Sequence, residues 1–172
     1  YHLMNQPSSG SQELNLTEEQ KIDLALEKYE LTIGLTPIPS DKEFTCIKYL
    51  YLSQDDLSKM SSEQCSESCV LLNSFSFHIS RVINKEKTKL RWCNEKILSV
   101  IANNLSDYRY FSAEERMALC IKDNDYAKKI KKLSTLIQAR IDRIEYLPIR
   151  LEKVAESLSN LAYSKRRNNE SR

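Results

Sequence analysis

The chain has 172 residues, with 26 Lys or Arg against 24 Asp or Glu, two glycines and four prolines. Phosphate-cradling loops need glycine for their positive-φ positions, so Gly10 and Gly34 alone exclude a P-loop and a glycine-rich dinucleotide-binding loop. The same shortage of turn residues argues against an all-β fold, and no apolar run reaches the roughly 18 residues that a membrane span requires. We therefore expect an all-α protein without a membrane span.

Charge is distributed unevenly between the two halves of the chain. Residues 1–80 carry five Lys and twelve Asp or Glu, a net charge of −7, whereas residues 81–167 carry twenty Lys or Arg and eleven acids, a net charge of +9. An acidic half followed by a basic half is typical of contact with nucleic acid, or with another copy of the chain, through the basic half.

The five cysteines are an odd number and follow no secretory leader, which predicts a reducing, cytoplasmic location. Cys65 and Cys69 share a helix face, but no nearby Cys or His completes a zinc site. We expect free thiols that pack as small apolar side chains, and no metal or other cofactor.

The N-terminal part divides into a flexible polar leader at 1–12 and a small acidic helical region at 13–60. In this region Thr17 and Gly34 are the start and stop signals of one helix. A short helix is expected over 42–52, and a capped turn follows at Ser53. Helices this short need a longer element to pack against.

A long helical hairpin is predicted over 61–167, followed by a tail at 168–172. Its first helix runs from Ser61 or Ser62 to about Leu105, and its second from about Asn124 to Lys165. The connector contains a capping box at Ser112 that predicts a helix over 113–121. Two long helices joined in this way most simply form an antiparallel pair, closed within one chain or swapped between two chains.

The second long helix has apolar residues at alternating intervals of three and four, which is the repeat of a coiled coil. Pro148 removes one backbone donor, which predicts a kink near 145–148 or two helices in series. The repeat continues across this proline, with Arg140 at a position that would otherwise be apolar. Its residues are Ile130, Leu133, Ile137, Ile144, Leu147, Leu151, Val154, Leu158 and Leu161.

Catalytic chemistry has no local pattern in this chain. Of the two histidines, His2 lies in the leader and His78 lies on a helix beside Phe75 and Ile79, where a structural role is expected. The carboxylates stand beside lysines on helix faces. We do not expect an enzyme.

Basic side chains on both long helices, with aromatic residues in the connector, suggest a surface for single-stranded nucleic acid. Cations neutralise phosphates, and aromatic rings stack on unpaired bases. The alternative is that these lysines only keep a helix solvated. The predicted nucleic-acid-binding residues are Arg81, Lys85, Lys89, Arg91, Lys96, Tyr108, Lys128, Lys129, Lys131, Lys132, Arg140 and Arg143.

The region from about 74 to 167 resembles the UvsY-type recombination mediators of tailed phages. The resemblance lies in "RVINKEKTKLRWCNEKILSVIANNLSDY", an aromatic-containing connector, "SAEERMALCIKDNDYAKKIKKL" and the closing "ARIDRIEYLPIRLEKVAESLSNLAYSKRR". It implies a helical homo-oligomer in the host cytoplasm that binds single-stranded DNA without sequence preference. Such a mediator helps to load a RecA-like recombinase onto strands coated by a single-strand-binding protein.

A second interpretation uses the same hairpin for protein contacts. The chain would then be a phage structural or assembly adaptor, in which the acidic half of one copy meets the basic half of the next. The sequence leaves open the number of copies, the partner and any preference between DNA and RNA.

Overall fold

A computed structural model describes residues 16–35, 46 and 48–170, and every regular element in these ranges is a helix. The all-α class is confirmed. The predicted leader, and residues 42–45 and 47 of the short helix expected over 42–52, lie outside the described residues. The chain divides into two compact units, residues 1–36 and 37–172.

The first unit contributes the helix α1 (Glu18–Thr32). It begins as predicted, since the Thr17 hydroxyl accepts from the Gln20 backbone N–H while the Gln20 side chain accepts from the Thr17 N–H. It is followed by Gly34 at φ +84°, a conformation that side-chain-bearing residues rarely adopt. None of the α1 residues is buried.

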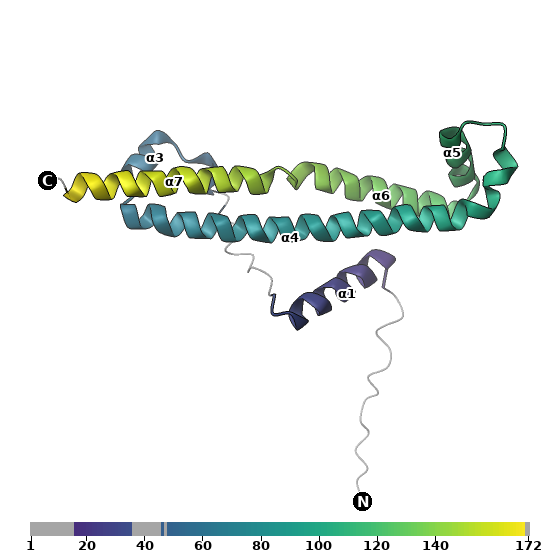
Figure 1. Ribbon diagram of the computed structural model, residues 1–172, viewed down its shortest axis with the longest axis horizontal. Helices are drawn as coiled ribbons and strands as arrows, with labels where there is room; N and C mark the ends of the chain where they lie inside the picture. Colours follow the sequence, from purple (N-terminus) through teal and green to yellow (C-terminus); the bar gives the residue numbers. More distant parts are fainter. Residues whose placement is uncertain (1–15, 36–45, 47, 171–172) are drawn as a thin grey trace, which may run out of the picture. The chain divides into compact units, whose positions relative to one another are not determined.

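The second unit is an antiparallel helical hairpin, as the sequence predicted. One arm is α4 (Ser62–Ile101), whose 40 residues extend for about 60 Å. The other arm consists of α6 (Asp125–Ile144) and α7 (Leu147–Glu170) in series. The first half of α4 lies along α7 and its second half along α6 (Figure 1).

The connector joins the two arms with short helices. α4 ends at Ile101, before the predicted Leu105, and the chain continues as the 3₁₀ helix η3 (Ala102–Tyr108). α5 (Ala113–Asp123) then begins at the predicted capping box, in which the Ser112 hydroxyl accepts from the Glu115 N–H. These helices lie together at one end of the hairpin (Figure 1).

The break between α6 and α7 is a two-residue turn at 145–146. Pro148 is the second residue of α7, where its missing N–H would have no helical partner in any case. Pro148 is also buried, and its carbonyl lies 3.2 Å from the Ser76 hydroxyl of α4. Of the two predicted outcomes, the structure has two helices in series.

The residues of α6 and α7 that pack against α4 form a seam, in which buried positions recur at intervals of three and four residues. Five of the nine predicted apolar positions are only half-buried: Leu133, Ile144, Leu147, Val154 and Leu161. The residue after each of them is buried instead, except after Ile144. Most of these replacements are small, which lets the two arms approach closely. The buried seam residues are Ala127, Ile130, Ser134, Ile137, Ile141, Pro148, Leu151, Ala155, Leu158 and Ala162.

The seam contains two apolar cores. One joins α4 and α7 around Leu72 and Leu151, and the other joins α4, α5 and α6 around Ile101 and Ile137. Between them lies a stretch with buried polar groups, including Glu86. The two arms are therefore held by apolar packing near both ends and by polar contacts in the middle.

The segment before α4 packs against the first core. It comprises Cys46, the 3₁₀ helix η2 (Lys48–Tyr51) and α3 (Gln54–Lys59). The Cys46 thiol lies 3.6 Å from the Leu71 carbonyl of α4, and burial raises the pKa of this thiol. This contact explains why the segment belongs to the hairpin unit.

Lys165 holds α3 against α7. It occupies a seam position near the end of α7, and its ammonium donates to the carbonyls of Leu57 (2.7 Å), Ser58 (3.3 Å) and Met60. A cation is favoured here because the last carbonyls of a helix carry partial negative charge and have no helical partner.

We predict that Lys165→Met frees these carbonyls and loosens α3. Hydrogen bonds to a charged group contribute about 1.5–3 kcal/mol, so amide exchange in α3 should become faster while α6 remains protected. Hydrogen exchange with mass spectrometry measures both. Lys132→Met, at an exposed position of α6, is the control. Unchanged exchange in α3 would contradict this role of Lys165.

Candidate nucleic-acid interface

The hairpin has two long flanks, and side-chain contacts identify which residues share each of them. On the first, called the polar flank, Arg166 Nη2 donates to Ser66 Oγ at 3.0 Å, and Ser76 Oγ lies 3.0 Å from Glu152 Oε1. Farther along, a shallow groove of about 420 Å³ separates α4 from α6. Its lining includes Leu90, Asn94, Lys131, Ser134 and Gln138.

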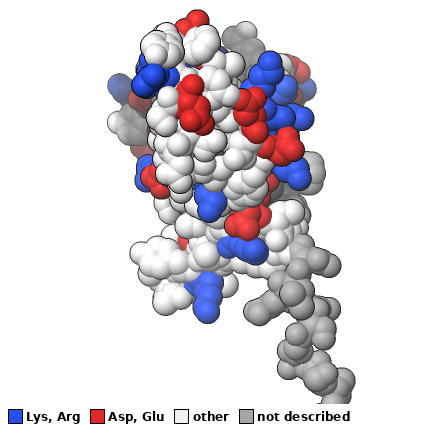
Figure 2. Space-filling view, turned by 90° about the vertical axis from the view of Figure 1, so that its right-hand side faces the viewer, with Lys and Arg blue, Asp and Glu red and all other residues white. Residues whose placement is uncertain are grey.

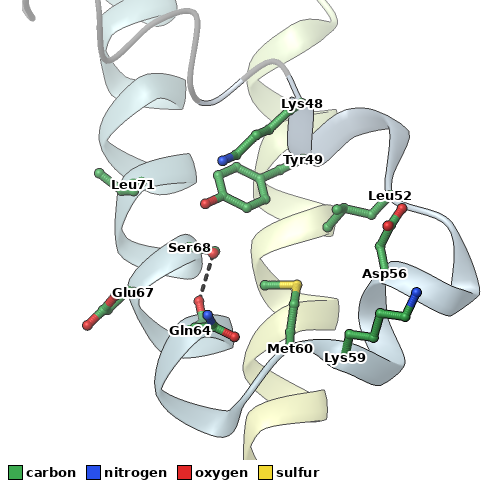
Figure 3. Close-up of a pocket in the computed structure, with 10 residues that line it drawn as sticks. All are labelled: Lys48, Tyr49, Leu52, Asp56, Lys59, Met60, Gln64, Glu67, Ser68 and Leu71. Atoms are coloured by element: carbon green, nitrogen blue, oxygen red, sulfur yellow. Dashed lines mark hydrogen bonds between the residues drawn. The ribbon is translucent and has the colours of Figure 1, made fainter.

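The opposite flank is covered at one end by η2 and α3. Tyr49 points towards α4 and, together with Leu52, lines a hollow of about 460 Å³ that also contacts Ser68 and Leu71 (Figure 3). The same two residues line a second hollow of about 480 Å³, against α7 at Val154 and elsewhere. The segment thus lies over the seam on this flank.

Beyond this cover the flank is basic. Residues seven apart on a helix lie on one side of it. Lys85 and Lys96 of α4 and Lys129, Arg143 and Arg150 of the other arm therefore follow the part of this flank that η2 and α3 leave open, here called the uncovered flank. We call these five residues, together with Arg140, the positive edge. From Lys129 to Arg150 it extends for roughly 30 Å.

Among the described residues at the flank positions given below, none is acidic, but Glu86 of the seam lies beside Arg140 and the exposed Glu95 precedes Lys96. The acids of α6 and α7 lie elsewhere, for example Asp142 in the groove and Glu152 on the polar flank. A line of cations has a positive potential, which phosphates would experience. The flank positions are Phe75, His78, Val82, Lys85, Lys89, Trp92, Lys96 and Ser99 on α4, and Tyr126, Lys129, Leu133, Leu136, Arg140, Arg143, Leu147, Arg150 and Val154 on the other arm.

Two of the predicted binding residues serve the hairpin itself. Lys89 is only 4% exposed, and its ammonium lies 2.7 Å from Glu86 Oε1. Arg140 reaches the other carboxylate oxygen of Glu86 at 3.5 Å from across the seam. Lys89 is therefore not available to a phosphate, which corrects the sequence prediction, and Arg140 is only partly available.

Replacing Glu86 by Ala should leave Lys89 buried without its carboxylate. Breaking a buried ion pair in this way costs about 3–5 kcal/mol, so the urea midpoint followed by circular dichroism should fall sharply. The control is Glu95→Ala, at an exposed position of α4.

A double variant tests whether the lost stability comes from an unpaired buried charge or from the missing side-chain volume. Glu86→Leu combined with Lys89→Met removes both charges, and it should recover most of the lost stability because no uncompensated charge remains. A wild-type midpoint for Glu86→Ala would show that the ion group does not hold the two arms together.

Four of the five remaining predicted cations lie away from the positive edge. Arg91 and Lys132 are exposed on the outer faces of their helices, and Lys131 lines the polar-flank groove. Lys128 is held by Asp125 at 2.9 Å, and this contact lowers the pKa of the Asp125 carboxyl. Arg81 is half-buried on α4. The structure therefore divides the lysine cluster at 128–132 among several faces.

Tyr108 does not offer the free aromatic face that was predicted for it. Its phenol donates to the Asp123 carboxylate, which raises the phenol pKa, and its ring packs edge-on against Phe111. The exposed rings of the connector are Tyr110, with Arg109 above it, and Phe111. Charges of both signs are interspersed at this end of the hairpin (Figure 2), so the cations do not converge there.

Three members of the uncovered flank were not predicted from the sequence: Arg150, Trp92 and Leu136. Each lies seven residues from a predicted cation: Arg150 from Arg143, Trp92 from Lys85 and Leu136 from Lys129. The signal was present in this spacing. It was hidden because the buried seam contains small and polar residues that an apolar pattern ignores.

Other kinds of site find no support in the part of the chain that the structure describes. No cluster of three or more Cys, His, Asp or Glu side chains there could bind a metal. The five cysteines are free thiols. None of the described helices has the length and apolarity needed to cross a bilayer.

Comparison with protein-family models, curated proteins and solved structures finds no significant match to this chain. The resemblance to UvsY-type mediators thus depends on the sequence pattern alone, and the geometry of the positive edge is an independent observation.

Proposed function

We propose that the positive edge binds the phosphate backbone of single-stranded nucleic acid and that the protein does so without catalysis. The observation that carries this proposal is the line of cations that follows one flank between the two arms of the hairpin. Such a line neutralises several phosphates and reads no base, so binding is sequence-tolerant and falls with salt.

The shape of the edge favours an extended strand. Its cations belong to two helices whose axes lie about 8–10 Å apart, and they extend along these axes for roughly 30 Å. A single strand can follow this narrow line and expose its bases to the protein. With the resemblance described above, this supports a recombination mediator that binds single-stranded DNA and assists the loading of a RecA-like recombinase beside a single-strand-binding protein.

Oligomerisation forms part of the proposal, because each edge offers few cations and several linked edges gain avidity. The outer faces of the hairpin carry large apolar side chains that another chain could cover. Examples are Val70, Phe77, Ile149 and Tyr163, each more than half exposed. The same exposed residues favour the alternative of a phage structural or assembly adaptor that binds proteins through the hairpin.

The proposal predicts that Lys129, Arg143 and Arg150, changed together to Gln, bind a labelled oligothymidine at least tenfold more weakly than wild type does. The dependence of log K on log salt should become shallower by about 2, because roughly 0.7 is lost for each contact removed. Fluorescence anisotropy from about 50 to 300 mM salt measures both quantities.

A variant with the same change in net charge tests whether binding depends on the positive edge or only on the overall charge of the protein. Arg91, Lys128 and Lys132 changed to Gln remove the same three charges from the outer faces, and binding should weaken less than threefold. Equal losses in the two variants would refute the positive edge as the binding site. An absence of wild-type binding even at low salt would favour the adaptor.

A further inference from the structure

We infer that Trp92 is a base-stacking residue at the middle of the positive edge, so that the site recognises unpaired bases as well as phosphates. This inference rests on the proposed function. Trp92 is the only tryptophan of the chain and is half-buried on α4. Nothing in the backbone-neutralising role of the edge requires an aromatic side chain there.

The indole is fixed on one side and accessible on the other. It packs against the second apolar core, next to Cys93, while its partial exposure leaves some of the ring open on the uncovered flank. Across the seam, Glu86 pairs with Arg140 and Ser76 approaches Glu152, which places Trp92 level with about Leu136. Leu136 is 57% exposed, so the two form an apolar step in the edge.

Cations lie on both sides of this apolar step. Along α4, Lys85 is about 10 Å from Trp92 in one direction and Lys96 about 6 Å in the other. Arg143 and Lys129 lie at similar separations from Leu136 on the facing arm. A strand whose phosphates contact both groups of cations must pass over Trp92, and a base turned towards the protein would meet the indole.

Stacking on an indole suits a site without sequence preference, because every base has a π-face. An acidic protein segment with an apolar side chain could also fit a basic edge with an apolar step. The two occupants differ in one respect that can be tested: only the nucleic acid depends on having bases. The experiment therefore compares strands with and without them.

The full chain is titrated with labelled oligothymidine and with an abasic oligomer of the same length and charge. Wild type should prefer the strand with bases by about tenfold, and oligothymidine should quench the single tryptophan. Trp92→Phe should keep most of the preference and Trp92→Leu should lose it. Tyr146→Leu, at an exposed ring in the turn between α6 and α7, is the control and should change nothing.

The outcomes separate this inference from the proposed function. Equal wild-type affinity for the two strands, or oligothymidine binding with unchanged tryptophan emission, would overturn the role of Trp92 and leave a phosphate-binding edge intact. Failure to bind either strand would overturn the proposed function and the inference with it. The two wild-type measurements need no variant, so they decide the question even if Trp92→Leu folds poorly.

Discussion

The close approach of α4 to the facing arm is the constraint on which the rest of the structure depends. It follows from small or compact side chains at intervals of seven residues along that arm, among them Ala127, Ser134, Ala155 and Ala162. These positions turn α6 and α7 so that the larger apolar residues beside them are only half-buried. The same rotation brings Lys129, Arg143 and Arg150 to one flank and leaves the acids on other faces. Packing of the interior thus determines the charge pattern of the surface.

Glu86 connects the interior and this surface. Its carboxylate holds buried Lys89 and the partly exposed Arg140, so an ion group lies between two apolar cores. Such a group contributes little net stability, because the cost of desolvating the charges offsets their attraction. It nevertheless disfavours alignments of the two arms in which these charges would be buried without a partner. One structural device can therefore fix the alignment of the two arms.

Local features of the fold were predictable, whereas the orientation of the helices was not. Thr17, Ser61 and Ser112 start helices because each hydroxyl accepts from a backbone N–H three residues later, a signal that lies within one turn. The break near Pro148 follows from a missing donor. The side of α6 that faces α4 depends instead on packing between distant residues. A pattern of large apolar residues pointed to Leu133, one position away from buried Ser134. The predicted basic site accordingly included Lys89, which is buried, and omitted Arg150.

The central claim is that nucleic acid follows the positive edge rather than the outer faces of the hairpin. Lysine acetylation of the unmodified protein, read by mass spectrometry with and without a saturating oligothymidine, tests it most directly. The account predicts protection of Lys85, Lys96 and Lys129 and unchanged modification of Lys131 and Lys132, although all five belong to the same two helices. Equal protection of both groups of lysines, or protection of Lys131 and Lys132 alone, would contradict it.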